Sequence, residues 1–266
     1  MQTSSNQINR IQRLVINVLL LFGGRLIKVE NASRFTSPED PVIYAFNHNN
    51  AFETVLIPAY LIRARRWKKV SFIIDWMYGK IPLVGWFCRQ TEPVYVYNKR
   101  ARFKLYERFR LQHRSEDVFV KIIEKLNQQR SIGIFPEGKR NKNPYILRRG
   151  FNGVGYIALM AKAPVIPVGI EFQSSRKKGK MPGVGRFILR VGEPRIFAQA
   201  IHQVEQIERD DSIDPHAKKK LIHFHASEVT YHIMMDISRL SRKEYPYLAP
   251  SLAENFEKHI FSEIMR

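Results

Sequence analysis

A histidine and a glutamate follow a predicted buried strand. Residues 42–46 form a continuous apolar run, and His48 and Glu53 come directly after it. Ligands of open α/β sheets bind beyond the carboxyl ends of the strands, so a site is expected here. Residues five apart on one helix differ by about 140°, so the two side chains meet only if a turn precedes the helix. In that arrangement Glu53 accepts a hydrogen bond from one imidazole nitrogen and leaves the other as a general base.

Helix capping is the alternative role for Glu53. Asn50 lies three residues earlier, which is the spacing of a capping box, where the acid bonds a backbone N–H group instead of a histidine. A helix is predicted over Ala51 to Arg63. The two interpretations are compatible in part, because a carboxylate can accept several hydrogen bonds.

A second polar cluster follows the predicted strand 131–135 and reads Pro-Glu-Gly-Lys-Arg over residues 136–140. A rigid proline and a permissive glycine can hold a carboxylate at the strand end. Glu137 can then bind a polyol, and Lys139 and Arg140 can bind a phosphate. An ordinary turn is the alternative for this segment. We predict that the His48 and Glu137 turns open into one cleft.

Predicted strands and helices alternate along the chain. The strands cover residues 42–46, 70–74, 93–97, 131–135, 165–172 and 187–191, and the helices cover 8–22, 51–63, 116–129, 153–162 and 215–240. This order predicts an α/β fold with a single mixed, partly parallel sheet flanked by helices. We expect an interfacial helix in residues 1–28, one catalytic domain in 29–200, and a helical extension packed on that domain in 201–266. Residues 174–186 are expected to form a solvated hairpin loop, and residues 205–214 an acidic patch.

The composition is globular and strongly basic. The chain has 266 residues, of which 44% are apolar, and 44 Lys and Arg against 24 Asp and Glu give a net charge of +20. Such a charge attracts nucleic acid, anionic lipid, acidic carrier proteins or phosphorylated substrates. The one cysteine, Cys88, excludes an intrachain disulfide, and no secretory signal opens the chain. We therefore expect a protein of the cytoplasmic side.

The N-terminal helix is amphipathic. Apolar residues recur at helical spacing from Ile8 to Phe22, and Arg10, Arg13 and Asn17 form a polar stripe. Its apolar part is too short for a membrane span, which needs about 20 residues. It either lies in a membrane interface or packs on its own domain.

Together these motifs resemble the lysophospholipid acyltransferase superfamily, typified by lysophosphatidic acid acyltransferases. That family's first motif is a histidine with an acid five residues on, here His48 and Glu53. Its third is Phe-Pro-Glu-Gly, a small residue and Arg, here residues 135–140, and its fourth is a proline-rich apolar strand, here residues 164–167. The resemblance covers roughly residues 42–194 and implies a glycerolipid acyltransferase-like fold.

The resemblance implies transfer of an acyl group from acyl-CoA or acyl carrier protein to a lipid hydroxyl, without an acyl-enzyme intermediate. His48 would be the base and Glu53 its orienting acid. Glu137 and Arg140 would position the acceptor, and Gly138 would let the backbone approach it closely. No cofactor beyond the thioester cosubstrate is implied. The expected location is the cytoplasmic side of a membrane, peripheral or interfacial, with lipid as the partner surface.

Two departures from the family bear on the acceptor. Glu53 stands where Asp is commonest, and some branches that acylate lipid A and mannolipids also use Glu. In the second motif, Glu92 and Asn98 stand where a Gly and a phosphate-binding Arg are usual, with Lys99 and Arg100 as possible substitutes for that Arg. Lysophosphatidic acid is the favoured acceptor. A glycolipid, diacylglycerol or another hydroxyl lipid is the alternative, as is an inactive lipid-binding relative.

Three other functions are disfavoured. His223, His225 and His232 lack the spacing of a metal site, so no metal is expected. Cys88 has no identifiable partner base, so we interpret it as a small core residue. The basic residues are spread along the chain and no nucleic-acid-binding motif is present, which disfavours nucleic acid as a partner.

Overall fold

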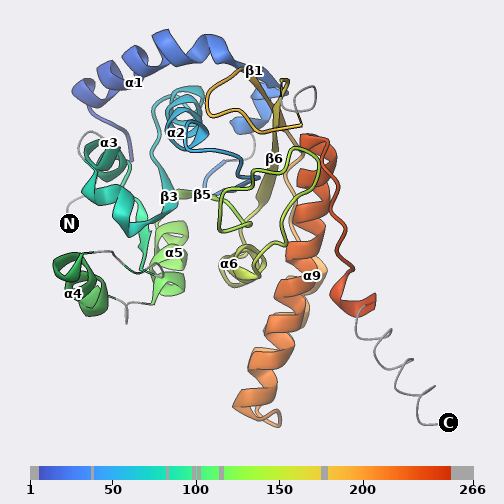
Figure 1. The fold of residues 1–266 in the computed structure, drawn as a ribbon. Coiled ribbons are helices and arrows are strands. Elements are labelled where there is room, and N and C mark those ends of the chain that lie inside the picture. The colour runs from blue at the N-terminus through green and yellow to red at the C-terminus, as the bar shows by residue number, and fades with distance from the viewer. Residues whose placement is uncertain are drawn as a thin grey trace.

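The computed structural model describes residues 6–36, 39–81, 84–97, 100, 103–113, 117–174 and 179–252. Within these ranges strands and helices alternate (Figure 1). The helices are α1 (Arg10–Gly23), α2 (Glu53–Ala64), α3 (Val84–Gln90), α4 (Lys104–His113), α5 (Val118–Asn127), α6 (Gly153–Ala161), α8 (Ala198–Arg209) and α9 (Pro215–Ser241). The strands are β1 (Ile27–Glu30), β2 (Ile43–Phe46), β3 (Val70–Asp75), β4 (Val94–Val96), β5 (Ser131–Ile134), β6 (Val165–Phe172) and β7 (Phe187–Val191).

The strands form one mixed sheet in the order β1-β7-β6-β2-β5-β3-β4. Strands β6, β2, β5, β3 and β4 are parallel, and β7 runs antiparallel to β6, with β1 parallel to β7. The predicted fold class, a single mixed and partly parallel sheet flanked by helices, is confirmed. Because β2 and β5 are parallel neighbours, with Ala45 opposite Ile134, the segments after these two strands emerge side by side.

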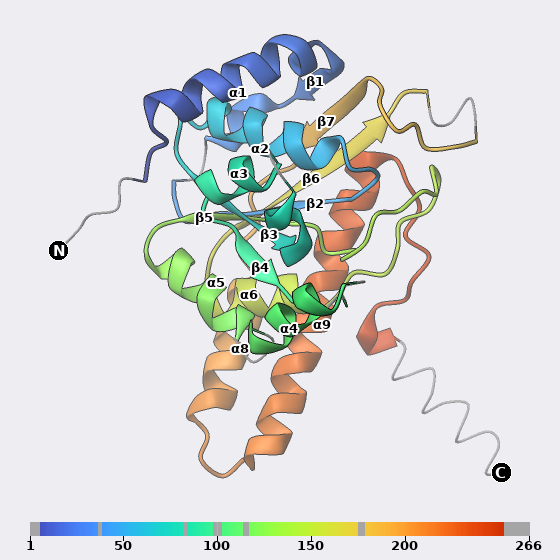
Figure 2. The same ribbon diagram turned by 60° about the vertical axis from the view of Figure 1, so that its left-hand side comes forward.

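Helices cover both faces of the sheet (Figure 2). One hydrophobic core joins α1 and α2 to one face, with the buried rings of Tyr44 and Phe46 at its centre. The other core joins α5, α6, α8 and α9 to the opposite face, where Ile43 and Ala45 point. This alternation along β2 is the period of two that a strand imposes on its side chains. The carboxyl end of β2 is therefore held from both sides.

The carboxyl end of α9 lies directly on β6. A Cβ atom built on Gly169 would lie 2.2 Å from the carbonyl carbon of Leu240 and 2.3 Å from the amide nitrogen of Ser241. No side chain fits between backbones at this distance, so a glycine is required. The contact fixes the position of the carboxyl end of α9 relative to the sheet.

Several elements differ from the sequence-based expectations. Strand β1 and helices α3 and α4 were not predicted, and α8 occupies part of the segment expected only as an acidic patch. Strand β1 has four residues and none is buried, so it lacks the apolar run of a central strand. Helix α8 buries only Val204. The division of the chain at residues 28 and 200 stays a prediction. In the described ranges, no helix combines the length and apolarity that crossing a membrane requires.

Candidate active site

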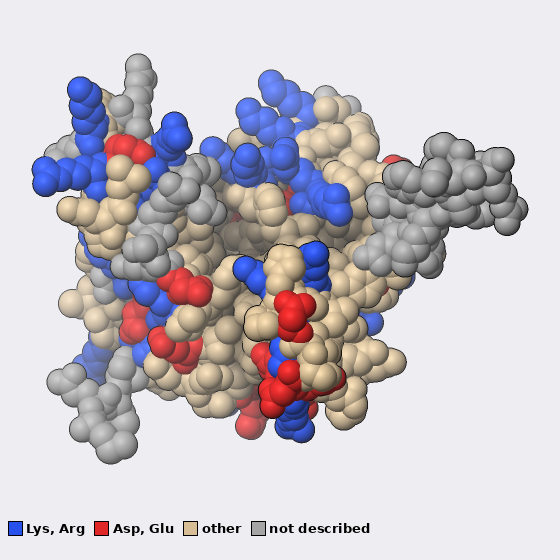
Figure 3. Space-filling model, turned by 90° about the horizontal axis from the view of Figure 1, so that it is seen from below, with Lys and Arg blue, Asp and Glu red and all other residues tan. Residues whose placement is uncertain are grey.

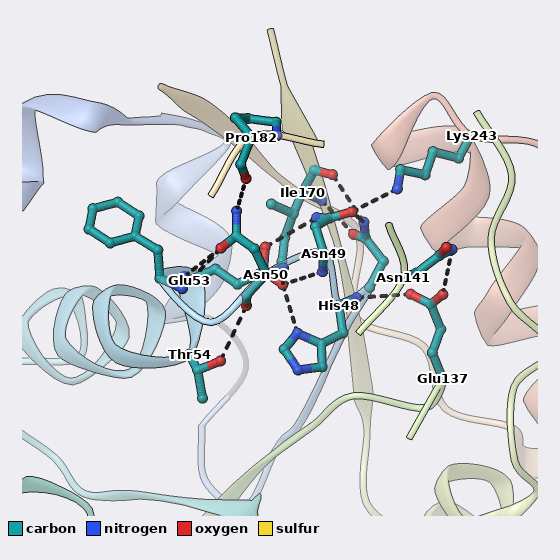
Figure 4. Close-up of polar contacts among 12 residues, drawn as sticks. His48, Asn49, Asn50, Glu53, Thr54, Glu137, Asn141, Ile170, Pro182 and Lys243 are labelled. Atoms are coloured by element: carbon teal, nitrogen blue, oxygen red, sulfur yellow. Dashed lines mark hydrogen bonds and ion pairs between the residues drawn. The ribbon is translucent and has the colours of Figure 1, made fainter. Parts of the chain in front are cut away.

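The turn between β2 and α2, residues 47–52, carries His48. Asn47 anchors this turn to β6, because its amide donates to the Ile170 carbonyl at 3.0 Å and accepts from the Ile170 N–H at 2.6 Å. At the other end, the Asn50 amide donates to the Pro182 carbonyl at 2.9 Å. The turn is thus tied to the sheet below it and to the β6–β7 loop beside it (Figure 4).

His48 and Glu53 are in direct contact. His48 Nδ1 lies 2.8 Å from Glu53 Oε1, and the exposed fractions of the two side chains are 13% and 0%. A carboxylate can only accept, so Nδ1 carries the proton and Nε2 of the neutral ring is the basic nitrogen. The Phe135 ring packs on the imidazole with a centroid distance of 4.4 Å. Among the residues that the structure describes, His48 Nε2 has no hydrogen-bond partner and is available to a substrate.

Glu53 also caps helix α2. Its carboxylate accepts from the backbone N–H groups of Asn49 and Asn50, and from Asn49 Nδ2 at 3.1 Å. The Asn50 side chain returns the contact by accepting from the Glu53 N–H at 3.2 Å. The two interpretations of the sequence therefore coexist: one carboxylate completes a capping box and also binds the histidine.

Glu137 holds the His48 turn from the opposite side. It is 1% exposed, and its Oε1 accepts from the His48 N–H at 2.8 Å. Its Oε2 accepts from Asn141 Nδ2 and from the Arg148 N–H, both at 2.9 Å, and the Asn141 N–H donates to the His48 carbonyl at 2.7 Å. Burial raises the pKa of Glu137, although the hydrogen bonds from His48 and Arg148 and the charge of Lys243 oppose the rise. These contacts give Glu137 a positioning role at the His48 turn, and the acceptor-binding role expected from the sequence stays a prediction.

The other predicted acceptor-binding residues are exposed or fall outside the described ranges. Gly138 has a φ of 63°, a conformation that favours glycine, and a Cβ there would meet the Phe151 ring. Lys139 and Arg140 extend into solvent, and Arg100 is also exposed. Lys99 lies outside the described residues.

Sequence reasoning missed Asn49, Asn141 and Lys243. Lys243 Nζ donates to Asn49 Oδ1 at 2.7 Å and to the Asn143 carbonyl at 2.8 Å, although these residues lie 194 and 100 positions away in the chain. The sequence does show three asparagines next to His48, namely Asn47, Asn49 and Asn50. Nothing local pointed to Lys243, because only the packing of α9 brings it here.

An apolar cavity of about 210 Å³ opens beside the His48 turn. It is lined by Ala51 of that turn, by α2 and β3, and by the segment between Tyr78 and Pro93. Cys88 contributes to the wall, and burial raises the pKa of its thiol, which keeps the thiol neutral. The lining is mostly hydrocarbon and suits an apolar ligand.

The chain is similar to known acyltransferases in sequence pattern and in fold. The model of a family described as Acyltransferase matches residues 26–171. No curated protein matches the chain. Among solved structures, the chain is similar to the 1-acyl-sn-glycerophosphate (LPA) acyltransferase PlsC from Thermotoga maritima, with 19% identity, 79% of each chain covered and a TM-score of 0.48.

We predict that Glu137→Gln destabilises the protein by about 1–3 kcal/mol at pH 7, because an amide cannot accept on both sides and leaves a buried N–H group unpaired. The raised pKa means that the folded state favours protonated Glu137, so this group's contribution to stability falls as pH rises. The cost of the substitution is therefore smaller at pH 8 than at pH 5. Urea unfolding at both pH values measures it.

The matched control is Glu208→Gln, which changes an exposed carboxylate on α8. It should leave the free energy of unfolding within about 0.5 kcal/mol of wild type. Equal stability of Glu137→Gln and Glu208→Gln would contradict the positioning role of Glu137.

Proposed function

Because this chain belongs to the Acyltransferase family, we propose that it transfers a fatty acyl group from a thioester to a hydroxyl group of a lipid, with His48 as general base. The family membership makes the chain an acyltransferase and supports the predicted relationship to the lysophospholipid acyltransferases. The observation that carries the finer proposal is the 2.8 Å contact between His48 Nδ1 and Glu53 Oε1. It orients a basic Nε2 that no described residue occupies.

The proposed reaction proceeds in two steps. His48 Nε2 takes the proton of the acceptor hydroxyl as its oxygen attacks the thioester carbonyl. The tetrahedral intermediate then expels the thiolate, which takes the proton from His48, so that ester and thiol are the products. Glu53 remains ionised, holds the ring orientation and balances the positive charge that the imidazole carries between the steps.

We assign the apolar cavity beside the His48 turn to the acyl chain. A thioester carbonyl near His48 Nε2 places its hydrocarbon tail next to Ala51, at the edge of this cavity. Burying each methylene group contributes roughly 0.8 kcal/mol, so the cavity gives the donor affinity and sets its chain length.

Cations near the site suit phosphate-bearing substrates. The exposed cations after Glu137 are Lys139, Arg140, Lys142, Arg148 and Arg149. Figure 3 shows Lys and Arg side chains gathered toward one edge of the molecule on both sides of a hollow. We propose that Lys139 and Arg140 bind the acceptor headgroup, with lysophosphatidic acid as the favoured acceptor. The thioester is that of coenzyme A or acyl carrier protein, both of which are anionic.

Helix α1 is proposed to bind the membrane surface. Its inner face packs on α2 through Ile16 and Gly23, whereas its outer face exposes a second apolar stripe. The exposed side chains recur at helical spacing and are Ile11, Leu14, Val18, Leu21 and Phe22. A helix that packs on its domain and still exposes such a stripe can enter the lipid interface, where the net positive charge favours anionic lipid. We propose on this basis that the enzyme is peripheral, on the cytoplasmic side of a membrane.

We expect His48→Ala to lower acyl transfer by about 10²- to 10⁴-fold, because it removes the base, while vesicle binding is retained. The assay uses a labelled acyl thioester with lysophosphatidic acid, other lysophospholipids, diacylglycerol and glycolipids. His216→Ala removes an exposed histidine and serves as the control. Product with another acceptor alone would change the acceptor assignment, and no product with any pair would indicate an inactive lipid-binding relative.

We expect Cys88→Trp to shift the preferred acyl donor to shorter chains, because the indole fills the apolar cavity. The preference, expressed as a ratio of kcat/KM values for long and short donors, should change by at least about tenfold. Leu111→Trp adds the same ring at an exposed position and should leave the ratio unchanged. An unaltered chain-length profile in Cys88→Trp would place the acyl chain elsewhere.

We expect Leu14→Glu to weaken binding to anionic vesicles by at least about tenfold, since it places a charge in the apolar stripe of α1. Ile196→Glu is the matched control, because Leu14 and Ile196 are both 63% exposed. Vesicle sedimentation measures both variants. If they bound equally well, α1 would not be the membrane contact.

A further inference from the structure

A buried cation lies beside the two buried carboxylates of the site. Lys243 is 5% exposed, and its Nζ donates to Asn49 Oδ1 and to the Asn143 carbonyl. Asn49 in turn donates from its backbone and from Nδ2 to Glu53, which holds His48 (Figure 4). A continuous chain of hydrogen bonds thus runs from Lys243 to the imidazole.

The backbone on both sides of Lys243 is fixed. Arg242 ends α9 with a φ of 57°, and the Lys243 N–H donates to the Ser238 carbonyl at 3.1 Å. The next residue, Glu244, donates to the Tyr145 carbonyl at 2.7 Å and accepts from the Leu147 N–H at 2.8 Å. These two hydrogen bonds join the segment after β5 to the segment that follows α9.

The close contact between α9 and β6 sets the position from which Lys243 reaches the site. At Gly169 the backbones approach so closely that no Cβ fits. Lys243 follows this contact by two residues, so its side chain starts from a fixed point above the sheet. A flexible surface lysine would not enter a buried network, because ordering its side chain and desolvating its charge both oppose burial.

The titratable groups of the network are His48, Glu53 from α2, Glu137 from the turn after β5, and Lys243. Glu171, on neighbouring β6, has its own partners in Arg190 and Arg242. The cations of segment 139–149 are exposed to solvent.

We infer that Lys243 is a positioning residue for acyl transfer, which orients Glu53, and through it the His48 ring, by way of Asn49. This inference rests on the proposed function of His48. Without Lys243 the surroundings of His48 would lose a positive charge, which favours the imidazolium, so a smaller fraction of His48 would be the free base. The helical extension, which lies outside the family match, thus supplies a residue on which the site depends.

The test uses the full-length protein and three substitutions of Lys243. Lys243→Met removes charge and hydrogen bonds, Lys243→Gln keeps a donor without charge, and Lys243→Arg keeps the charge. The control is Lys220→Met, on an exposed position of α9. The pH profile of kcat/KM is measured for each variant, and the titration of His48 is followed by NMR.

Lys243→Met and Lys243→Gln are expected to move the acid limb of the profile and the His48 titration to higher pH, by about one unit. Lys243→Arg is expected to restore both toward wild type, and Lys220→Met to change neither. If Lys243→Met does not fold, Lys243→Gln alone decides the question.

An unchanged acid limb and titration in Lys243→Gln, with His48→Ala inactive, would overturn the inference and leave the proposed function intact. If wild type showed no His48-dependent transfer, the proposed function would fail, and the His48 titration would still decide the role of Lys243. A shift that Lys243→Arg fails to reverse would also count against a role for the charge.

Discussion

The burial of one carboxylate is the constraint on which the rest of the site depends. Glu53 is fully buried, and an ionised carboxylate is stable there only when hydrogen bonds and opposite charge replace water. The turn of residues 47–52 meets this requirement by directing two backbone N–H groups, an asparagine amide and an imidazole at the same group. The histidine is thereby a structural partner of the acid as well as the proposed base. Orientation of the imidazole follows from satisfying the buried charge.

The sheet brings the remaining parts to this turn. Parallel pairing of β2 with β5 sets the Glu137 turn beside the His48 turn, and pairing of β2 with β6 lets Asn47 bond Ile170. Glu137 then holds the His48 backbone, and the end of α9 closes the network from the other face. Burying these polar groups costs free energy of folding, which the two hydrophobic cores offset. Precision at the site therefore comes from elements that lie far apart in the sequence.

Much of this arrangement was predictable from the sequence. The central strands have apolar runs, and β6 and β7 have the bounds expected. A buried strand is recognisable in a sequence because nearly all of its residues are apolar. The contact between His48 and Glu53 was predictable because a turn followed by a helix start was the one local geometry that joins them. The amphipathic pattern of α1 left two alternatives, and the structure reveals two apolar faces, one packed and one exposed. Lys243 was not predictable, because its place is set by backbone contact between α9 and β6 and has no local signature.

Contact with Glu53 sets the tautomer of the His48 ring, with the proton on Nδ1 and the lone pair on Nε2. The most direct measurement is the ¹⁵N NMR spectrum of His48 in the full-length protein above the titration range of the ring, assigned by comparison with His48→Ala. We predict a protonated Nδ1 and an unprotonated Nε2. A proton on Nε2 would contradict it, because the nitrogen that faces the substrate would then be a donor and could not accept the hydroxyl proton.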